Sequence, residues 1–172
     1  MARDRDSTWF DPHQMGQQIR LNRTYPQVQG SVFFSSRTLV SNPLGVSDSL
    51  RNQYYRFPAL LPIMARKGDP QIAAPVWLKV RGRAGRTRLR WKISDESTRY
   101  FAVYRFPADQ EATLEDSRFL LTIVSALCNG ERLRKRAHYR DRTSQPSVRY
   151  QYVVTALNRT HHESSSIRVK MK

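Results

Sequence analysis

The stretch YQYVVTALNRTHHESSSIRVK, residues 150–170, has the pattern of a β-hairpin. Its first half places aromatic, apolar and amide residues on every second position, at Tyr150, Tyr152, Val154, Ala156 and Asn158. A polar turn follows, and a second alternating segment begins at Ile167. Successive side chains of a strand point to opposite faces, so this alternation is typical of strands that bury one face. The stretch therefore predicts two neighbouring antiparallel strands.

Five segments upstream are also candidates for short strands. They are WLKVRGR (77–83), TRLRWKI (87–93), RYFAVYRF (99–106), FLLTIVSAL (119–127) and RAHYRDRT (136–143). FLLTIVSAL is also apolar enough to be a short buried helix. About seven strands separated by polar turns predict an antiparallel β-sandwich, because a parallel sheet would need helices between its strands. The alternating arginines of TRLRWKI are expected on the solvent face of this sandwich.

The first seventy residues follow a different pattern. Asp11-Pro12 is typical of a helix start and predicts a helix over about 12–23. GSVFFSS (30–36) predicts a buried strand, and Ser47 is placed to cap a second helix through SLRNQYY (49–55). The segment LPIMARKGDPQIAAP (61–75) contains three prolines and a glycine, which indicates a linker. The sequence thus predicts two domains, residues 1–70 and 71–172.

Charge is the strongest compositional signal. A lone cysteine excludes an internal disulfide and a multi-cysteine metal site. The 172 residues carry a formal net charge of +16. Such a charge attracts polyanions, although a solvated basic surface is an equally good interpretation. No apolar run is long enough to span a membrane. The start, MARDRDSTWF, lacks a secretory pattern, so we expect either a cytoplasmic protein or one whose export signal lies upstream.

The second domain resembles fibronectin type III domains, an immunoglobulin-like sandwich. The resemblance is carried by Trp91, by FAVYR (101–105), and by the pattern Y-x-Y-x-V-x-A-x-N of residues 150–158. It implies that Trp91, Phe101, Tyr150 and Tyr152 are structural markers of the sandwich. It also implies that the Tyr150 hydroxyl caps the adjoining corner.

The first domain resembles another family. GSVFFSSRTLVSNPLGVSDSLRNQYYRFPALLPIM (30–64) is similar to the last strand, loop and helix of glycosyl-hydrolase-like (family 10-like) (β/α)-barrel proteins of bacterial envelopes. In these proteins a fibronectin-like module follows the barrel. The resemblance implies a small α/β barrel remnant over residues 1–70, which we expect to be poorly ordered without the missing barrel. It also implies a parent glycoside hydrolase acting on peptidoglycan, located in the cell envelope as a periplasmic or lipid-anchored protein.

The resemblance argues against catalysis by this chain alone. A complete barrel needs about 200 residues, and glycosidases need two carboxyl groups across one bond. None of the acids before residue 70 follows the GSVFF strand, where barrel chemistry takes place. We therefore expect a non-catalytic accessory module that packs on the missing catalytic barrel and contacts wall glycan or another acidic polymer. The alternative is an independent basic protein that binds polyanions or nucleic acid, although specific recognition of nucleic acid is not expected.

Few residues qualify as a site. Ser35, Ser36, Arg37 and Asn42 would lie at the rim of a complete barrel and contact sugar hydroxyls, although ordinary loop roles are the favoured interpretation. His161-His162 lies beside Glu163, but neighbours on a strand point to opposite faces and form a poor metal site. The sequence accordingly predicts no catalytic residue, no cofactor and no metal.

Overall fold

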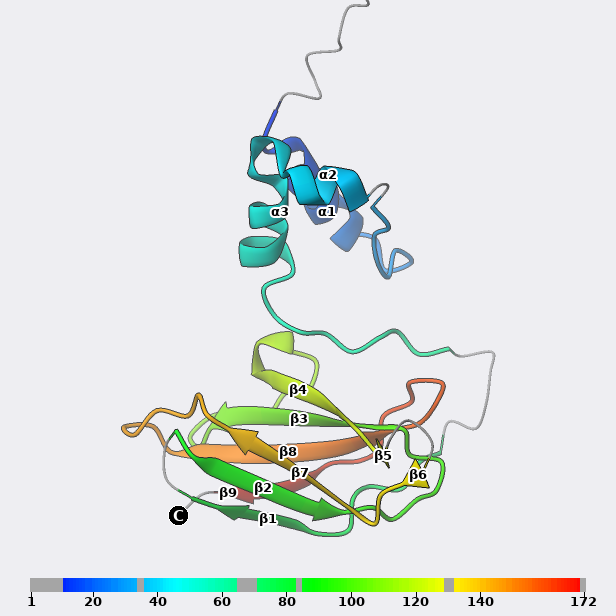
Figure 1. Cartoon of the computed structure of the whole chain (residues 1–172), viewed down its shortest axis with the longest axis vertical. Helices are drawn as coiled ribbons and strands as arrows, with labels where there is room; N and C mark the ends of the chain where they lie inside the picture. Colours follow the sequence, from blue (N-terminus) through cyan, green and yellow to red (C-terminus); the bar gives the residue numbers. More distant parts are fainter. Residues whose placement is uncertain (1–10, 34–35, 65–70, 83–84, 129–131, 171–172) are drawn as a thin grey trace, which may run out of the picture. The chain divides into compact units, whose positions relative to one another are not determined.

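The computed structural model describes residues 11–33, 36–64, 71–82, 85–128 and 132–170 (Figure 1). The chain divides into two compact units, residues 1–56 and 57–172. The sequence-based boundary near residue 70 lies in the segment 65–70, outside the described residues. Each unit is described by itself.

The first unit is built from short helices. They are α1 (Gln14–Arg23), α2 (Ser36–Ser41), the 3-10 turn η2 (Pro43–Gly45), α3 (Val46–Ser49) and the π-helical turn η3 (Leu50–Tyr54). Both predicted helices are confirmed, because α1 lies within 12–23 and the run from α3 to η3 includes most of SLRNQYY. Among the described residues of this unit, the buried ones are Gly16, Ile19 and Leu50. The unit therefore has a small core.

The strand predicted over residues 30–36 is wrong for the residues that the structure describes. Residues 30–33 are irregular and Ser36 begins α2. Val32 is 99% exposed, so this segment has neither a partner strand nor a covering layer. A lone apolar run cannot satisfy its backbone groups as a strand, and the pattern alone does not reveal whether a partner is present.

The second unit contains all strands of the described residues. They are β1 (Leu78–Arg81), β2 (Thr87–Lys92), β3 (Tyr100–Pro107), β4 (Leu120–Ser125), β5 (Leu127–Cys128), β6 (Arg132–Leu133), β7 (Arg136–Asp141), β8 (Tyr150–Leu157) and β9 (Ile167–Lys170). One sheet has the order β1-β2-β7, a second has the order β4-β3-β8-β9, and β5 pairs with β6. All pairs are antiparallel. The seven predicted strands are confirmed, including FLLTIVSAL as β4, and the unit is mainly β.

The two large sheets share one hydrophobic core. Leu89 and Trp91 of β2 meet Phe101 of β3 and Tyr152 of β8 within a single buried cluster. The Trp91 and Phe101 rings contact edge to face, with centroids 5.4 Å apart. All four side chains are fully buried, and Tyr150 is 8% exposed. The sequence markers of the sandwich therefore lie in its interior.

Strand β8 is buried along its whole length, on both faces. Val154 and Ala156 face the core between the sheets, whereas Val153 and Leu157 belong to a second cluster with Tyr104. That second cluster is completed by partly buried side chains of connecting segments, namely Leu60, Ala112, Leu114 and Phe119. Loops thus cover the outer face of the four-stranded sheet, while the outer face of β1-β2-β7 carries exposed side chains.

Candidate functional site

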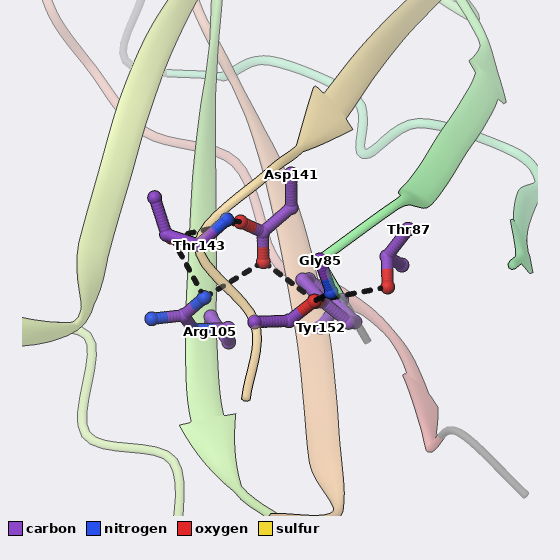
Figure 2. Close-up of polar contacts among 7 residues, drawn as sticks. Gly85, Thr87, Arg105, Asp141, Thr143 and Tyr152 are labelled. Atoms are coloured by element: carbon purple, nitrogen blue, oxygen red, sulfur yellow. Dashed lines mark hydrogen bonds and ion pairs between the residues drawn. The ribbon is translucent and has the colours of Figure 1, made fainter. Parts of the chain in front are cut away.

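A buried carboxylate, Asp141, joins the two sheets at the end of β7 (Figure 2). One oxygen, Oδ2, accepts hydrogen bonds from Arg105 Nη1 of β3 at 2.8 Å and from the Tyr152 hydroxyl of β8 at 2.7 Å. The other, Oδ1, accepts from the Thr143 backbone N–H and hydroxyl, each at 2.8 Å. The Arg105 guanidinium also lies 4.6 Å from the centre of the Tyr150 ring. Side chains from β3, β8 and the loop after β7 therefore converge on one carboxylate.

The environment of Asp141 keeps it ionised. Burial by itself raises the pKa of this carboxyl, but the hydrogen bonds from Thr143, Tyr152 and Arg105 outweigh burial and lower the pKa below its ordinary value of 3.8. Burial and the neighbouring carboxylate together raise the pKa of Tyr152. The phenol therefore stays protonated and donates its hydrogen bond.

A glycine turn extends this network. Gly85 has a positive φ of 73° and donates its backbone N–H to the Ser144 hydroxyl at 2.7 Å. Ser144 lies 3.3 Å from the Thr87 hydroxyl at the start of β2. The left-handed conformation favours glycine at this turn. The β1–β2 turn is thereby fixed to the loop after β7, as Figure 2 shows.

The Asp141 network has a structural role. Four hydrogen bonds occupy the carboxylate and its side chain is 0% exposed, so no substrate atom can approach it. Sequence reasoning missed Asp141, although one signal was present. In RAHYRDRT an acid falls on the same alternating positions as Ala137 and Tyr139, which face the core. An acid at an inward position requires a buried partner.

A second carboxylate, Glu163, stabilises the end of β8. Its Oε1 accepts hydrogen bonds from the Tyr104 hydroxyl at 2.8 Å and the Thr155 hydroxyl at 2.6 Å. Burial and this carboxylate raise the pKa of Tyr104. Glu163 therefore also serves packing, between β3, β8 and the turn that follows.

The open polar pocket of the second unit lies where the β2–β3 loop meets the turn after β8. It has a volume of about 400 Å³ and is lined by Gln71, Asp95, Ser97, Arg99, Asn158, Arg159 and Thr160. Asp95 is held in place by backbone N–H groups of Ala73 at 3.0 Å and Ser97 at 2.7 Å. These bonds lower the pKa of Asp95, the one from Ala73 most. The pocket thus combines an ionised acceptor, hydroxyl groups and guanidinium donors.

Two arginines contribute differently to this pocket. The Arg99 guanidinium donates to the carbonyls of Glu96 at 2.8 Å and Thr98 at 3.0 Å, so the loop holds it in place. Arg159 is exposed at the pocket rim. Sequence reasoning singled out neither, because residues about sixty positions apart meet here only through the pairing of β3 with β8.

The predicted ligand contacts lie in the first unit. Ser36 and Arg37 are exposed at the start of α2, and Ser35 lies outside the described residues. The Asn42 side chain binds Asp48 Oδ2 and the backbone N–H of Ser47, each at 2.8 Å. With a positive φ of 47°, Asn42 stabilises the turn before α3. Contact of these residues with a ligand stays a prediction.

The His161-His162 pair lies in a tight turn. Asn158 Oδ1 accepts from the backbone N–H groups of Thr160 at 2.9 Å and His162 at 3.0 Å, and His161 has a positive φ. Within the ranges that the structure covers, no three histidine, cysteine or acidic side chains gather as metal ligands. The same ranges contain no helix of the length and apolarity needed to cross a bilayer.

Comparisons with known proteins give one informative relative. The chain is 31% identical over 166 residues to the glycosyl hydrolase YngK of Bacillus subtilis (strain 168), an alignment that covers 94% of the chain and 30% of YngK. The chain therefore spans less than a third of that relative, and no family model matches it. A pectate lyase structure from Erwinia chrysanthemi, PelI with tetragalacturonic acid, has a TM-score of 0.41 at 14% identity. The matched region covers 57% of this chain and 28% of PelI, and a similarity this low supports no conclusion about fold or function.

The similarity relates almost the whole chain to part of a protein that is named a glycosyl hydrolase. It also corrects one prediction. We expected this chain not to be an enzyme, but the relative aligned along almost its whole length is named a glycosyl hydrolase. The expectation that the chain is not an enzyme was wrong because it was based only on the barrel rim and on the acids of the first seventy residues. The similarity to YngK extends through both units.

Proposed function

We propose that this chain is part of a glycosyl hydrolase, and that its second unit holds a sugar ring of the substrate in the polar pocket. The observation that carries the proposal is the 31% identity to a glycosyl hydrolase over 166 residues. The pocket suits the role because sugar hydroxyls both donate and accept hydrogen bonds. Asp95 supplies an acceptor, Arg99 and Arg159 supply donors, and the hydroxyl oxygens of Ser97 and Thr160 can accept.

In this proposal the second unit is an accessory sandwich of the fibronectin type III type. The division into three and four strands supports this assignment, as does the burial of Trp91 against Phe101. The resemblance implied that the Tyr150 hydroxyl caps the corner of the sandwich. Within the described residues, the tyrosine hydroxyl that joins the two sheets belongs to Tyr152, which donates to Asp141. Tyr150 instead stacks against Arg105. We propose peptidoglycan glycan strands as the substrate class and the cell envelope as the location, on the resemblance of residues 30–64.

The test is release of reducing ends from denuded peptidoglycan glycan strands and from a panel of neutral polysaccharides. The protein containing this chain is expected to hydrolyse at least one of them. The variant Arg159→Ala should raise KM about fivefold or more and leave kcat unchanged, because it removes binding that is equal in ground and transition states. Arg149→Ala, another exposed arginine outside the pocket, is the control. Absence of hydrolysis across the panel refutes the proposed activity. An unchanged KM for Arg159→Ala refutes the role of the pocket.

A further inference from the structure

The outer surface of the β1-β2-β7 sheet is strongly basic. Alternate residues of each strand point away from the core, and the exposed set is Lys79 and Arg81 of β1, Arg88, Arg90 and Lys92 of β2, and Arg136, His138 and Arg140 of β7. These residues are called the basic face. The inward alternates include Leu89, Trp91 and Ala137, which are buried. The strand pattern therefore separates an apolar layer from a cationic one.

The register places like charges directly opposite one another. Arg88 of the central strand is paired with Arg81 on one side and Arg140 on the other. Arg90 is paired with Lys79 on one side and lies opposite His138 on the other. Neighbouring strands lie about 4.8 Å apart, and alternate residues along one strand about 6.8 Å apart. Like charges opposite each other destabilise a sheet, so a bound anion would relieve this repulsion.

The described residues offer these cations no internal anion. Throughout the ranges that the structure covers, the ion pairs are Arg105–Asp141 and Arg118–Asp116, and neither involves the basic face. Asp141, the acid on β7, points inward and is fully buried. The charges of the basic face are therefore available to an external ligand.

The basic face is also hollowed. A groove of about 260 Å³ is lined by Trp77, Lys79, Arg81, Arg88, Arg90 and Arg136. Trp77 is 40% exposed at its border, and its backbone carbonyl accepts from the Lys92 N–H. An indole offers a flat apolar surface to one side of a sugar ring. Arginine forks bind carboxylates through two parallel hydrogen bonds.

We propose that the basic face binds a linear acidic polysaccharide that carries carboxylate groups along its length. The inference goes beyond the polar pocket and rests on the proposed carbohydrate function. Nucleic acid fits less well. Proteins that bind single strands stack successive bases on several aromatic side chains, and this groove is bordered by Trp77 alone among its lining residues. The basic face also spans three strands, whereas the β-element typical of the DNA major groove, about 12 Å across, is a two-stranded ribbon.

The test measures binding of the whole chain to alginate, to alginate whose carboxyls are reduced to alcohols, and to single-stranded and duplex DNA, over a salt series. We expect alginate to bind at least tenfold tighter than the reduced polymer and than either DNA at physiological salt. The double variant R88Q/R90Q should lose tenfold or more in affinity and show a shallower salt dependence. Trp77→Ala should lose about fivefold with the salt dependence unchanged.

The control is R149Q/R168Q, which removes the same net charge from exposed positions outside the basic face and should lose less than twofold. Equal losses in the two double variants would overturn the proposal, because they would indicate net charge instead of a site. DNA binding as tight as alginate binding would also overturn it. The outcome is independent of catalysis: alginate binding without hydrolysis of any glycan would refute the proposed function alone, and hydrolysis without alginate binding would refute this inference alone.

Discussion

Replacing Asp141 by asparagine should destabilise the second unit strongly. The variant leaves Arg105 without its ion partner, and the new NH2 group faces the donors on one side of the former carboxylate, either Tyr152 and Arg105 or Thr143. Removing one partner of a buried pair costs about 3–5 kcal/mol. The Arg105 side chain is 18% exposed and regains some water, so the lower end, about 3 kcal/mol, applies. The free energy of unfolding of a whole domain is about 5–15 kcal/mol.

The assay is urea unfolding of the whole chain followed by tryptophan fluorescence, since Trp91 lies in the core between the sheets. With a slope of about 2 kcal/mol per molar urea, the midpoint should fall by about 1.5 M. Asp116→Asn is the matched control, because Asp116 also pairs with an arginine, Arg118, but at the surface. Asp116 also accepts a hydrogen bond from the Arg118 backbone N–H at the start of the 3-10 turn η4 (Ser117–Phe119). Asparagine caps such a turn as well as aspartate does, and exposed ion pairs contribute little, so this change should leave the midpoint almost unchanged. Equal midpoint shifts in the two variants would refute the structural role of the Asp141 network.

Two further predictions concern acid and local stability. The pKa of Asp141 is lowered on folding, so its stabilising contribution is present above the unfolded pKa of about 4 and is lost as the pH falls through the folded value. Wild-type stability should therefore fall more steeply than that of Asp141→Asn below about pH 4, and parallel curves would contradict this. In amide exchange, α1 and η3 should be less protected than β3 and β8, because the described core of the first unit is so small. Equal protection in both units would show the expectation to be wrong.

Alternation in the sequence was sufficient to locate most of the strands, whereas FLLTIVSAL, which does not alternate, was left open between a strand and a short buried helix. The side-chain period of two in TRLRWK and YQYVVTAL depends on local geometry alone, and it assigned Arg88 and Arg90 to solvent and Trp91 to the core before any partner strand was known. The helix at α1 follows equally from local signals. Reliance on local signals also explains the wrong prediction of a strand at GSVFFSS. An apolar run shows that a segment could be buried, but it does not show whether the fold supplies a second layer to cover it.

Only the tertiary structure decided which residues meet. The Asp141 network joins β3, β7 and β8, and the polar pocket joins Asp95 with Arg159, pairs that no spacing in the sequence brings together. The basic face likewise depends on register, because one residue of slippage between β2 and β7 would remove the rows in which Arg88 lies opposite Arg140. Side-chain alternation is a property of each strand by itself. Pairing and register depend on the energy of the whole core, and for that reason the sequence determined the layers of this protein while its sites required the folded chain.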